Sequence, residues 1–336
     1  MGHDIHFSFN IDNLIPHADE RTTQNILALW QEAAESLHGC TLPCVQPGTS
    51  KSVNVSFKAD FSAILKCLHA ASTQSGSFDA YRRLHLQNSA LPVGASLPLT
   101  VSCDTRLEPG DAFALGYLFA QQLYLTLNLA LPGACQMLGV SFRGEGAHRY
   151  EAPSLDSKVF YDARMSAQQQ DWPTLAHLSI EQVRNWLGHT GFSRSDVAIS
   201  AINKVLFHLL KLGQQSHRYG SKSALLVIQQ IELLLGQPLG QDETGRLRER
   251  CKLVLGDIPE AADCFIALFQ LRTDLLQGKH PVRRPTLIGH TLSAENRELV
   301  AAHNSAIELG ASIVVGLLQN LIIKDKEQFV FREVLL

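Results

Sequence analysis

The sequence predicts an α+β domain over residues 1–143, followed by an all-α helical domain over residues 180–336. Before residue 144, short segments that alternate apolar and polar residues lie between helical segments. After residue 180, apolar residues recur only at spacings of three and four. The stretch 144–179 is polar and contains glycine, proline and glutamine runs, which indicates a linker or wrapped loop. A chain of 336 residues that is 45% hydrophobic is long enough for two domains with ample core.

The first domain is expected to contain strands and helices in mixed order. Ile5, Phe7, Phe9 and Ile11 alternate with polar residues, which predicts a half-buried strand over residues 4–11. Further strands are expected at 51–57, 97–103 and 138–143, and helices at 23–37, 61–71 and 111–131. The last of these helices is long and apolar, but Gln121, Gln122 and Asn128 favour a buried core helix over a membrane span.

The second domain is expected to be helical throughout. Its predicted helices lie at about 180–188, 196–213, 222–235, 244–255, 259–277 and 293–322. The last helix contains Gly310 and Gly316, which weaken it unless another helix packs closely at those positions.

Charge and cysteine content restrict the classes of partner and compartment. The formal net charge is −3, and the part from residue 180 onward is only mildly basic, which does not indicate a nucleic-acid-binding tail. Seven cysteines with no recognisable signal peptide, and no apolar run of roughly 18 residues, lead us to expect a reducing cytoplasm and no membrane. Cys40, Cys44 and His38 lack a second ligand pair at zinc spacing, so neither a metal nor another cofactor is expected.

The stretch from Asp263 to His280 carries the clearest functional signal. Its apolar helix contains Arg272 beside the buried face, and an arginine among apolar neighbours is costly to desolvate without an anionic partner. Glu232 lies in the apolar segment 223–236 and needs a cation for the same reason. The sequence therefore predicts a Glu232–Arg272 pair, which is compatible with either a structural or a catalytic role. Gly278 and Pro281 are expected to end the helix.

This stretch resembles the signature helix of the Apea-like HEPN family, in which an arginine is followed after four residues by a His-Gly pair. The segments 223–236 and 245–256 are similar to the family's preceding helices in order and spacing. The resemblance covers roughly residues 180–321. It implies a HEPN-like helical bundle that forms a homodimer, so that two copies of the motif meet in one cleft. It also implies metal-independent cleavage of RNA, typically as the effector of a bacterial antiviral or toxin system.

By this resemblance, Arg272 binds the scissile phosphate and Asp274 orients it. The sequence departs from the family at the histidine position, which is Gln277, and a glutamine amide cannot exchange a proton near neutral pH. His280, three residues later, is the remaining acid or base. Two hypotheses stay open: an endoribonuclease that uses His280, and a catalytically degenerate module for dimerisation and for binding a partner or nucleotide.

Cationic residues near the signature helix could extend an RNA-binding surface. Arg246, Arg248, Arg250 and Lys252 lie on one predicted helix, and Lys279, Arg283 and Arg284 follow the signature helix. An ordinary solvated face is the alternative for this group. The N-terminal domain is expected to sense or regulate, and a protein partner is expected to bind through it.

Overall fold

The computed structural model describes residues 3–13, 20–49, 51–73, 95–105, 107–133, 136–144, 152–214, 220–236, 243–280 and 293–331. Contacts divide the chain into two compact units. The first unit contains Met1–Lys158 and Ala176–Ser216, and the second contains Val159–Leu175 and His217–Leu336. The chain therefore passes from one unit to the other three times.

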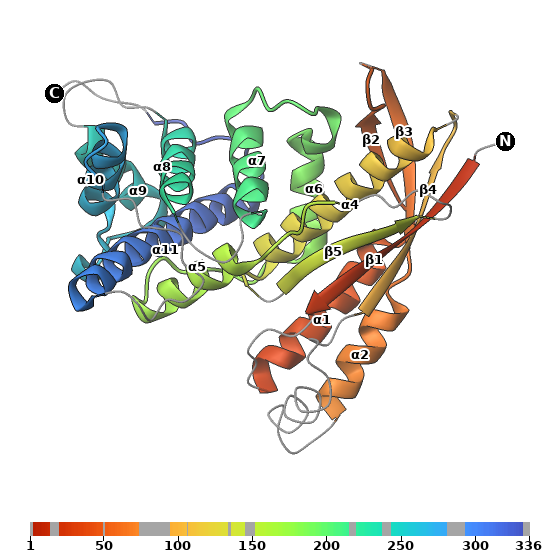
Figure 1. Cartoon of the computed structure of the whole chain (residues 1–336), viewed down its shortest axis with the longest axis horizontal. Helices are drawn as coiled ribbons and strands as arrows, with labels where there is room; N and C mark the ends of the chain where they lie inside the picture. The colour runs from red at the N-terminus through yellow and green to blue at the C-terminus, as the bar shows by residue number, and fades with distance from the viewer. Residues whose placement is uncertain are drawn as a thin grey trace. The chain divides into compact units, whose positions relative to one another are not determined.

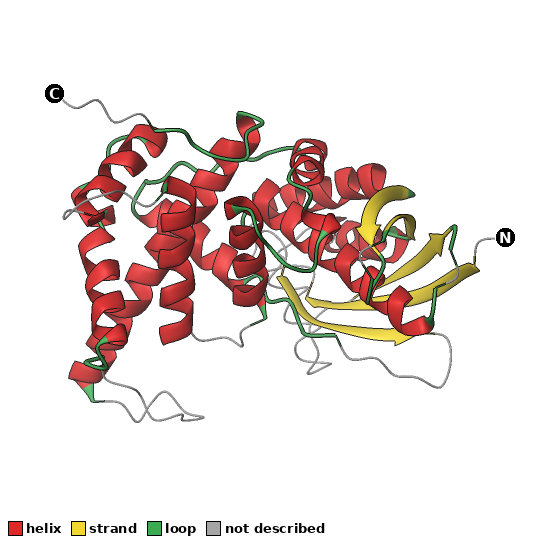
Figure 2. Cartoon of the chain, turned by 90° about the horizontal axis from the view of Figure 1, so that it is seen from above, coloured by secondary structure: helices red, strands yellow, loops and turns green. Residues whose placement is uncertain are grey.

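A five-stranded sheet forms part of the first unit (Figures 1 and 2). Its strands are β1 (His3–Asn13), β2 (Cys40–Val45), β3 (Ser52–Ala59), β4 (Ala95–Cys103) and β5 (Gln136–Gly144), in the order β2-β3-β4-β1-β5. All neighbouring strands are antiparallel. Phe7, Phe9 and Ile11 are buried, as the alternation predicts, whereas Asn54 and Lys58 on β3 are exposed. The sheet thus has one face toward the core.

Strand β2 was not predicted from the sequence, where its cysteines were considered only as metal ligands. It is an edge strand that contains Pro43, a residue that cannot donate a backbone hydrogen bond and that weakens a strand prediction. The hydroxyl of Ser193, in the 3-10 helix η1 (Phe192–Arg194), donates to the carbonyl of Pro43 at 2.8 Å. Proline and this covering helix together protect the edge from pairing with another chain.

Five helices complete the described part of the first unit: α1 (Glu20–Leu37), α2 (Ser62–Thr73), α4 (Pro109–Ala130), α6 (Ile180–His189) and α7 (Ala201–Gly213). Helices α1, α2 and α4 contact strands of the sheet. Helix α4 is a core helix, as expected, and even Gln122 and Asn128 on it are buried. The N-terminal part of the chain is therefore α+β, and helices alone follow β5.

Helices α6 and α7 pack in the first unit, and not with the later helices as the boundary at residue 180 predicted. The carboxylate of Glu32 on α1 accepts the backbone N–H of Ile180 at 2.7 Å, and Trp186 is buried. At the other end, the N–H of Asp156 donates to the carbonyl of Gly213 at 2.6 Å, and the carbonyl of Asp156 accepts the hydroxyl of buried Tyr124 at 2.7 Å. These bonds explain why α7 belongs with α4.

The second unit contains α5 (Lys158–Gln169), α8 (Ser221–Leu235), α9 (Glu243–Leu255), α10 (Phe265–Leu276), α11 (Ala294–Ile323) and the 3-10 helix η2 (Glu260–Ala262). Helix α5 corrects the expectation of a loop over 144–179. Its buried residues Val159, Phe160, Ala163 and Ala167 recur at helical spacing, but the polar and small residues between them hide the pattern.

Helix α11 is the central element of the second unit and contacts α8, α9 and α10. A Cβ added at Gly310 would lie 2.7 Å from Val227 and 2.9 Å from Leu268, so another helix does pack closely there. By length and composition, Arg297–Ile323 is the one described helix that could cross a membrane. The sequence had led us to expect no apolar stretch of sufficient length. However, 83% of its apolar window is buried inside the protein.

Candidate functional site

Arg272 lies near the C-terminal end of α10 and is bound by two carboxylates. Its Nη1 atom is 2.5 Å from Oε1 of Glu232 on α8 and 3.8 Å from Oε2 of Glu243 on α9. The guanidinium carbon also lies 5.8 Å from the centroid of the Phe269 ring. The Glu232 partner is the one expected from the sequence. Glu243 gave no signal because it lies in the polar first turn of α9 and not in an apolar segment.

The electrostatics of this cluster are dominated by the carboxylates. The side chain of Glu232 is only 10% exposed. Burial raises the pKa of Glu232, the positive charge of Arg272 opposes that shift, and the neighbouring Glu243 adds to it. With two carboxylates around one guanidinium, the cluster has a net charge of −1 when all three groups are ionised. Both carboxylates contact Nη1 of Arg272, so a phosphate bound by this guanidinium would lie close to their negative charges.

His280 lies beyond the end of α10 but is folded back by the helix cap. Gly278 has φ of 68°, a left-handed conformation that suits glycine. The N–H groups of Lys279 and His280 then both donate to the carbonyl of Asp274, at 2.8 and 3.1 Å. As a result, the His280 ring packs against His303 of α11, with ring centroids 4.8 Å apart.

His303 lies on α11 and is not among the residues that the family resemblance identifies. Burial and the nearby His280 lower the pKa of His303, and the carboxylate of Asp274 opposes that shift. Asp274 in turn accepts a hydrogen bond from Gln270 at 2.9 Å. Two close imidazoles resist double protonation, so one can stay neutral while the other carries a proton. We call His280, His303 and Asp274 the imidazole cluster.

The structure separates the catalytic residues that the resemblance groups together. Positions 272 and 274 lie about 200° apart around a helix, so their side chains leave α10 on nearly opposite sides. Arg272 reaches α8 and α9, whereas Asp274 acts on His303 of α11. Gln277 is the exposed C-cap residue of α10. Within one subunit, the described contacts thus form two groups and not one Arg–His site.

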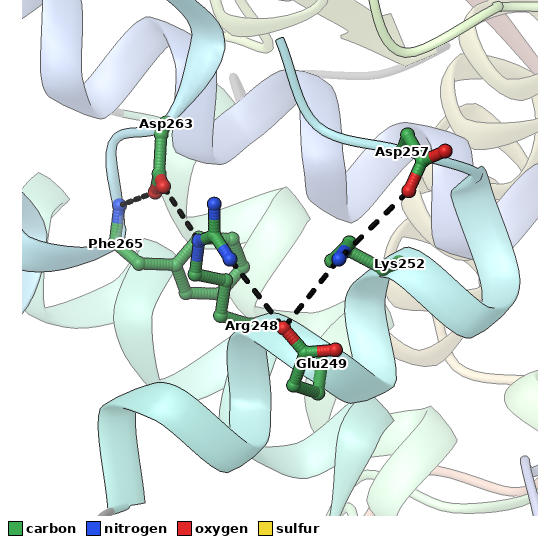
Figure 3. Close-up of polar contacts among 6 residues, drawn as sticks. All are labelled: Arg248, Glu249, Lys252, Asp257, Asp263 and Phe265. Atoms are coloured by element: carbon green, nitrogen blue, oxygen red, sulfur yellow. Dashed lines mark hydrogen bonds and ion pairs between the residues drawn. The ribbon is translucent and has the colours of Figure 1, made fainter. Parts of the chain in front are cut away.

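Two of the four cations of α9 that suggested an RNA-binding surface, Arg248 and Lys252, are bound to acidic groups (Figure 3). Arg248 Nε lies 2.5 Å from a carboxylate oxygen of Asp263, and Arg248 Nη1 lies 3.4 Å from Glu249. Lys252 lies 3.6 Å from Glu249 and 3.8 Å from Asp257. The charges of Arg248 and Lys252 are therefore each balanced by at least one carboxylate.

Arg250 has a structural partner of a different kind. It donates to the carbonyls of Leu235 and Gly236 at 2.8 and 2.9 Å, which caps the C-terminus of α8, and it lies over the ring of Phe331. Arg246 and Lys279 are exposed. Arg283 and Arg284 lie outside the described residues. Only part of the expected cationic surface therefore remains accessible.

Of the two cysteines near His38, Cys44 is buried and Cys40 is half-buried. Burial raises the pKa of Cys40 to about 11 and that of Cys44 to about 12. His38 instead donates to the carbonyl of Ala59 at 3.0 Å. Over the described segments, no group of three His, Cys, Asp or Glu side chains is placed to hold a metal ion.

These contacts define two kinds of site in the helical unit, a carboxylate-bound arginine and a pair of imidazoles. Comparisons with models of known families, with curated proteins and with solved structures find no match to this chain. The likeness to the HEPN family therefore depends on the sequence pattern alone.

Proposed function

We propose that the helical unit is a catalytically degenerate HEPN-like module that acts by self-association and by binding a partner or nucleotide. The observation that carries this proposal is the position of Arg272, whose guanidinium is held between Glu232 and Glu243. An arginine that stabilises a phosphate in catalysis must present its donors to the substrate. Here Nη1 of Arg272 is directed to two carboxylates, whose negative charges oppose a phosphate at the same guanidinium. In addition, Gln277 cannot replace the family's histidine in proton transfer.

Self-association through the helical unit needs a surface that is exposed in the single chain. The apolar faces of α8 and α11 are used inside the second unit, where Val227, Ile228 and Ile313 are buried. Ile266 and Leu276 on α10 remain 76% and 69% exposed. We place the contact between two copies on this exposed part of α10, because such aliphatic side chains gain most from removal from water.

Light scattering tests the self-association. At concentrations of tens of micromolar the wild type should have about twice the mass of one 37.0 kDa chain. Ile266→Asp should shift the protein toward the monomer, whereas a matched change on exposed Ala261→Asp should not. A wild type that stays monomeric as its concentration rises would contradict this part of the proposal.

An RNA cleavage assay in the presence of a chelator tests the loss of catalysis. Wild type, Arg272→Ala and Gln277→His should be compared on the same mixture of single-stranded RNAs. An inert wild type supports the degenerate module, and activity that appears in Gln277→His would show that the missing histidine is the cause. Cleavage by the wild type that disappears in Arg272→Ala would overturn the proposal.

Metal-independent RNA cleavage at the imidazole cluster is the second candidate function. It is favoured by the contact between His280 and His303, because a neutral imidazole can accept the proton of a ribose 2′-hydroxyl while an imidazolium protonates the leaving 5′-oxygen. In that case His280→Ala and His303→Ala should each lower the rate by about 10²–10⁴-fold. Exposed His177→Ala is the control, and equal rates in all variants would exclude this site.

We infer a reducing compartment such as the cytoplasm, and a role in bacterial antiviral defence or a toxin system, as the setting for either function. The six cysteines in the described segments, Cys40, Cys44, Cys67, Cys103, Cys251 and Cys264, are free thiols, which supports a reducing compartment.

A further inference from the structure

Helix α7 of the first unit carries two lysines, with a histidine between them, in a line on its outer face. Lys204, His208 and Lys211 follow one another at spacings of four and three residues, so they lie on one side of the helix, with the two lysines about 10 Å apart along its axis. Both lysines are exposed. They act together on the imidazole between them, because burial and then the charges of Lys211 and Lys204 lower the pKa of His208.

No acidic group balances these charges within the described residues. From Val197 to Gln214 the sequence contains no aspartate or glutamate, in contrast to α9, where each paired cation has a carboxylate nearby. The Nδ1 atom of His208 is buried and has no hydrogen-bond partner in the described structure. The outer face of α7 is therefore a surface of uncompensated positive charge.

An exposed aliphatic side chain continues the same face at the start of the helix. Ser200 is the N-cap, and its hydroxyl accepts the N–H of Asn203. The residue before an N-cap commonly packs against the fourth helical residue, which is Lys204 here and not an apolar residue. Ile199 consequently has no apolar partner at that position and is 82% exposed, and Val197 beside it is 68% exposed.

We propose that Ile199, Lys204, His208 and Lys211, here called the α7 stripe, form a docking surface for an acidic segment of a partner protein. That segment presents one aliphatic side chain to Ile199 and carboxylates to Lys204 and Lys211, which lie on either side of His208. The proposal goes beyond the function assigned to the second unit, because it concerns the first unit and does not depend on HEPN-like chemistry.

Two other anionic partners fit the α7 stripe less well. Nucleic-acid binding draws its affinity from many phosphate contacts and from stacking on aromatic side chains, but the stripe offers two lysines, one histidine and no aromatic residue. A membrane surface requires the apolar face of the helix, which α7 uses in the core through Ile202, Val205, Leu206, Leu209, Leu210 and Leu212. An acidic protein segment needs only the few charges and the single aliphatic contact that are present.

Fluorescence anisotropy with the full chain tests the proposal. The probe is a labelled helical peptide with one leucine followed by glutamates at positions four, eight and eleven after it, and the control peptide has glutamines in their place. We expect saturable binding of the acidic peptide alone, weakened at high salt because exposed charges are screened. Lys204→Glu combined with Lys211→Glu should weaken binding by roughly tenfold or more, since like charges then face each other.

Ile199→Ser should also weaken binding, while the charges of the stripe stay intact. Lys58→Glu combined with Lys66→Glu, which reverses two exposed lysines elsewhere in the first unit, is the matched control and should leave binding unchanged. Circular dichroism and thermal unfolding verify that each variant is folded. The proposal is overturned if the acidic peptide does not bind, if the two double variants bind equally, or if single-stranded RNA or phosphatidylserine vesicles bind more tightly through these residues.

Discussion

The Glu232–Arg272 pair links α8 to α10 through two side chains that are poorly accessible to water. Glu232→Ala should lower the free energy of unfolding by about 2–4 kcal/mol, because it leaves a partly buried guanidinium with only the more distant Glu243. In a double-mutant cycle with Arg272→Ala, urea unfolding should give a coupling of about 1–2 kcal/mol. Glu249→Ala, at a carboxylate 63% exposed, should cost less than about 0.5 kcal/mol. Additive effects at residues 232 and 272 would show that the pair does not stabilise the fold.

The raised pKa of Glu232 predicts a specific dependence of stability on pH. A carboxyl group whose pKa is higher in the folded state binds its proton more tightly there, so acidification stabilises the folded state relative to the unfolded chain. The free energy of unfolding of the wild type, relative to Glu232→Gln, should therefore increase as pH falls from neutral through the raised pKa toward the ordinary value of 4.5. A relative stability that decreases over this window would show that Arg272 outweighs burial.

Nuclear magnetic resonance titration of the histidines tests the imidazole cluster. His280→Gln removes a positive charge from beside His303, so the pKa of His303 should rise. Asp274→Asn removes the carboxylate that opposes the downward shift, so the pKa of His303 should fall. Shifts of opposite sign in the two variants are expected only if His280 and Asp274 both act on the His303 ring. Comparison with His303→Gln identifies which resonance belongs to His303. An unchanged His303 titration in both variants would contradict the cluster.

Single residues differ in how well the sequence could predict their partners. The burial of a charge in an apolar segment is visible in the pattern, which is why Glu232 could be matched with Arg272. Proximity created by a turn is not visible in the same way. His303 meets His280 only because Gly278 ends α10 and the two following N–H groups bond to Asp274.

At the scale of elements, periodicity predicted the long helices and the strands with clear alternation. It failed where a proline or interspersed polar residues obscure the apolar pattern. Strand β2 has Pro43 in its middle and lies at an edge, and α5 shows only a narrow apolar line between polar residues. The pattern also predicts that an element exists without saying where it packs, and for this reason α6 and α7 were assigned to the wrong side of the boundary.

Two glycines in α11 allow the helix packing to be tested directly. Gly310→Ala should destabilise the protein by about 1–2 kcal/mol, because overpacking against Val227 and Leu268 exceeds the gain in helix propensity. A Cβ at Gly316 would lie 3.2 Å from Pro173 and 3.4 Å from Leu255, which requires a smaller adjustment. Thermal unfolding should therefore show Gly316→Ala to be the milder change. Equal stability of both variants and the wild type would mean that α11 does not pack closely at Gly310.

At the scale of the whole molecule, the two compact units are not two consecutive halves of the sequence. Each unit is made of two separate stretches of the chain. We expect the fragment 1–216, which ends after α7, to unfold cooperatively in urea, and the fragment 1–179 to lack a cooperative transition. The shorter fragment loses buried Trp186 on α6 and the bond between Gly213 and Asp156. Near-ultraviolet circular dichroism and binding of a hydrophobic dye compare the two. Equal cooperativity would show that α6 and α7 are dispensable for the first unit.

The three crossings between units have a consequence for synthesis on the ribosome. Helix α5 is synthesised before all the other helices of the second unit. The last of those helices ends at Ile323. At roughly 5–20 residues per second, the nascent chain must carry the apolar side of α5 without its final partners for on the order of ten seconds or more. During this interval Val159 and Phe160 are accessible to molecular chaperones, although they are buried once the chain is complete.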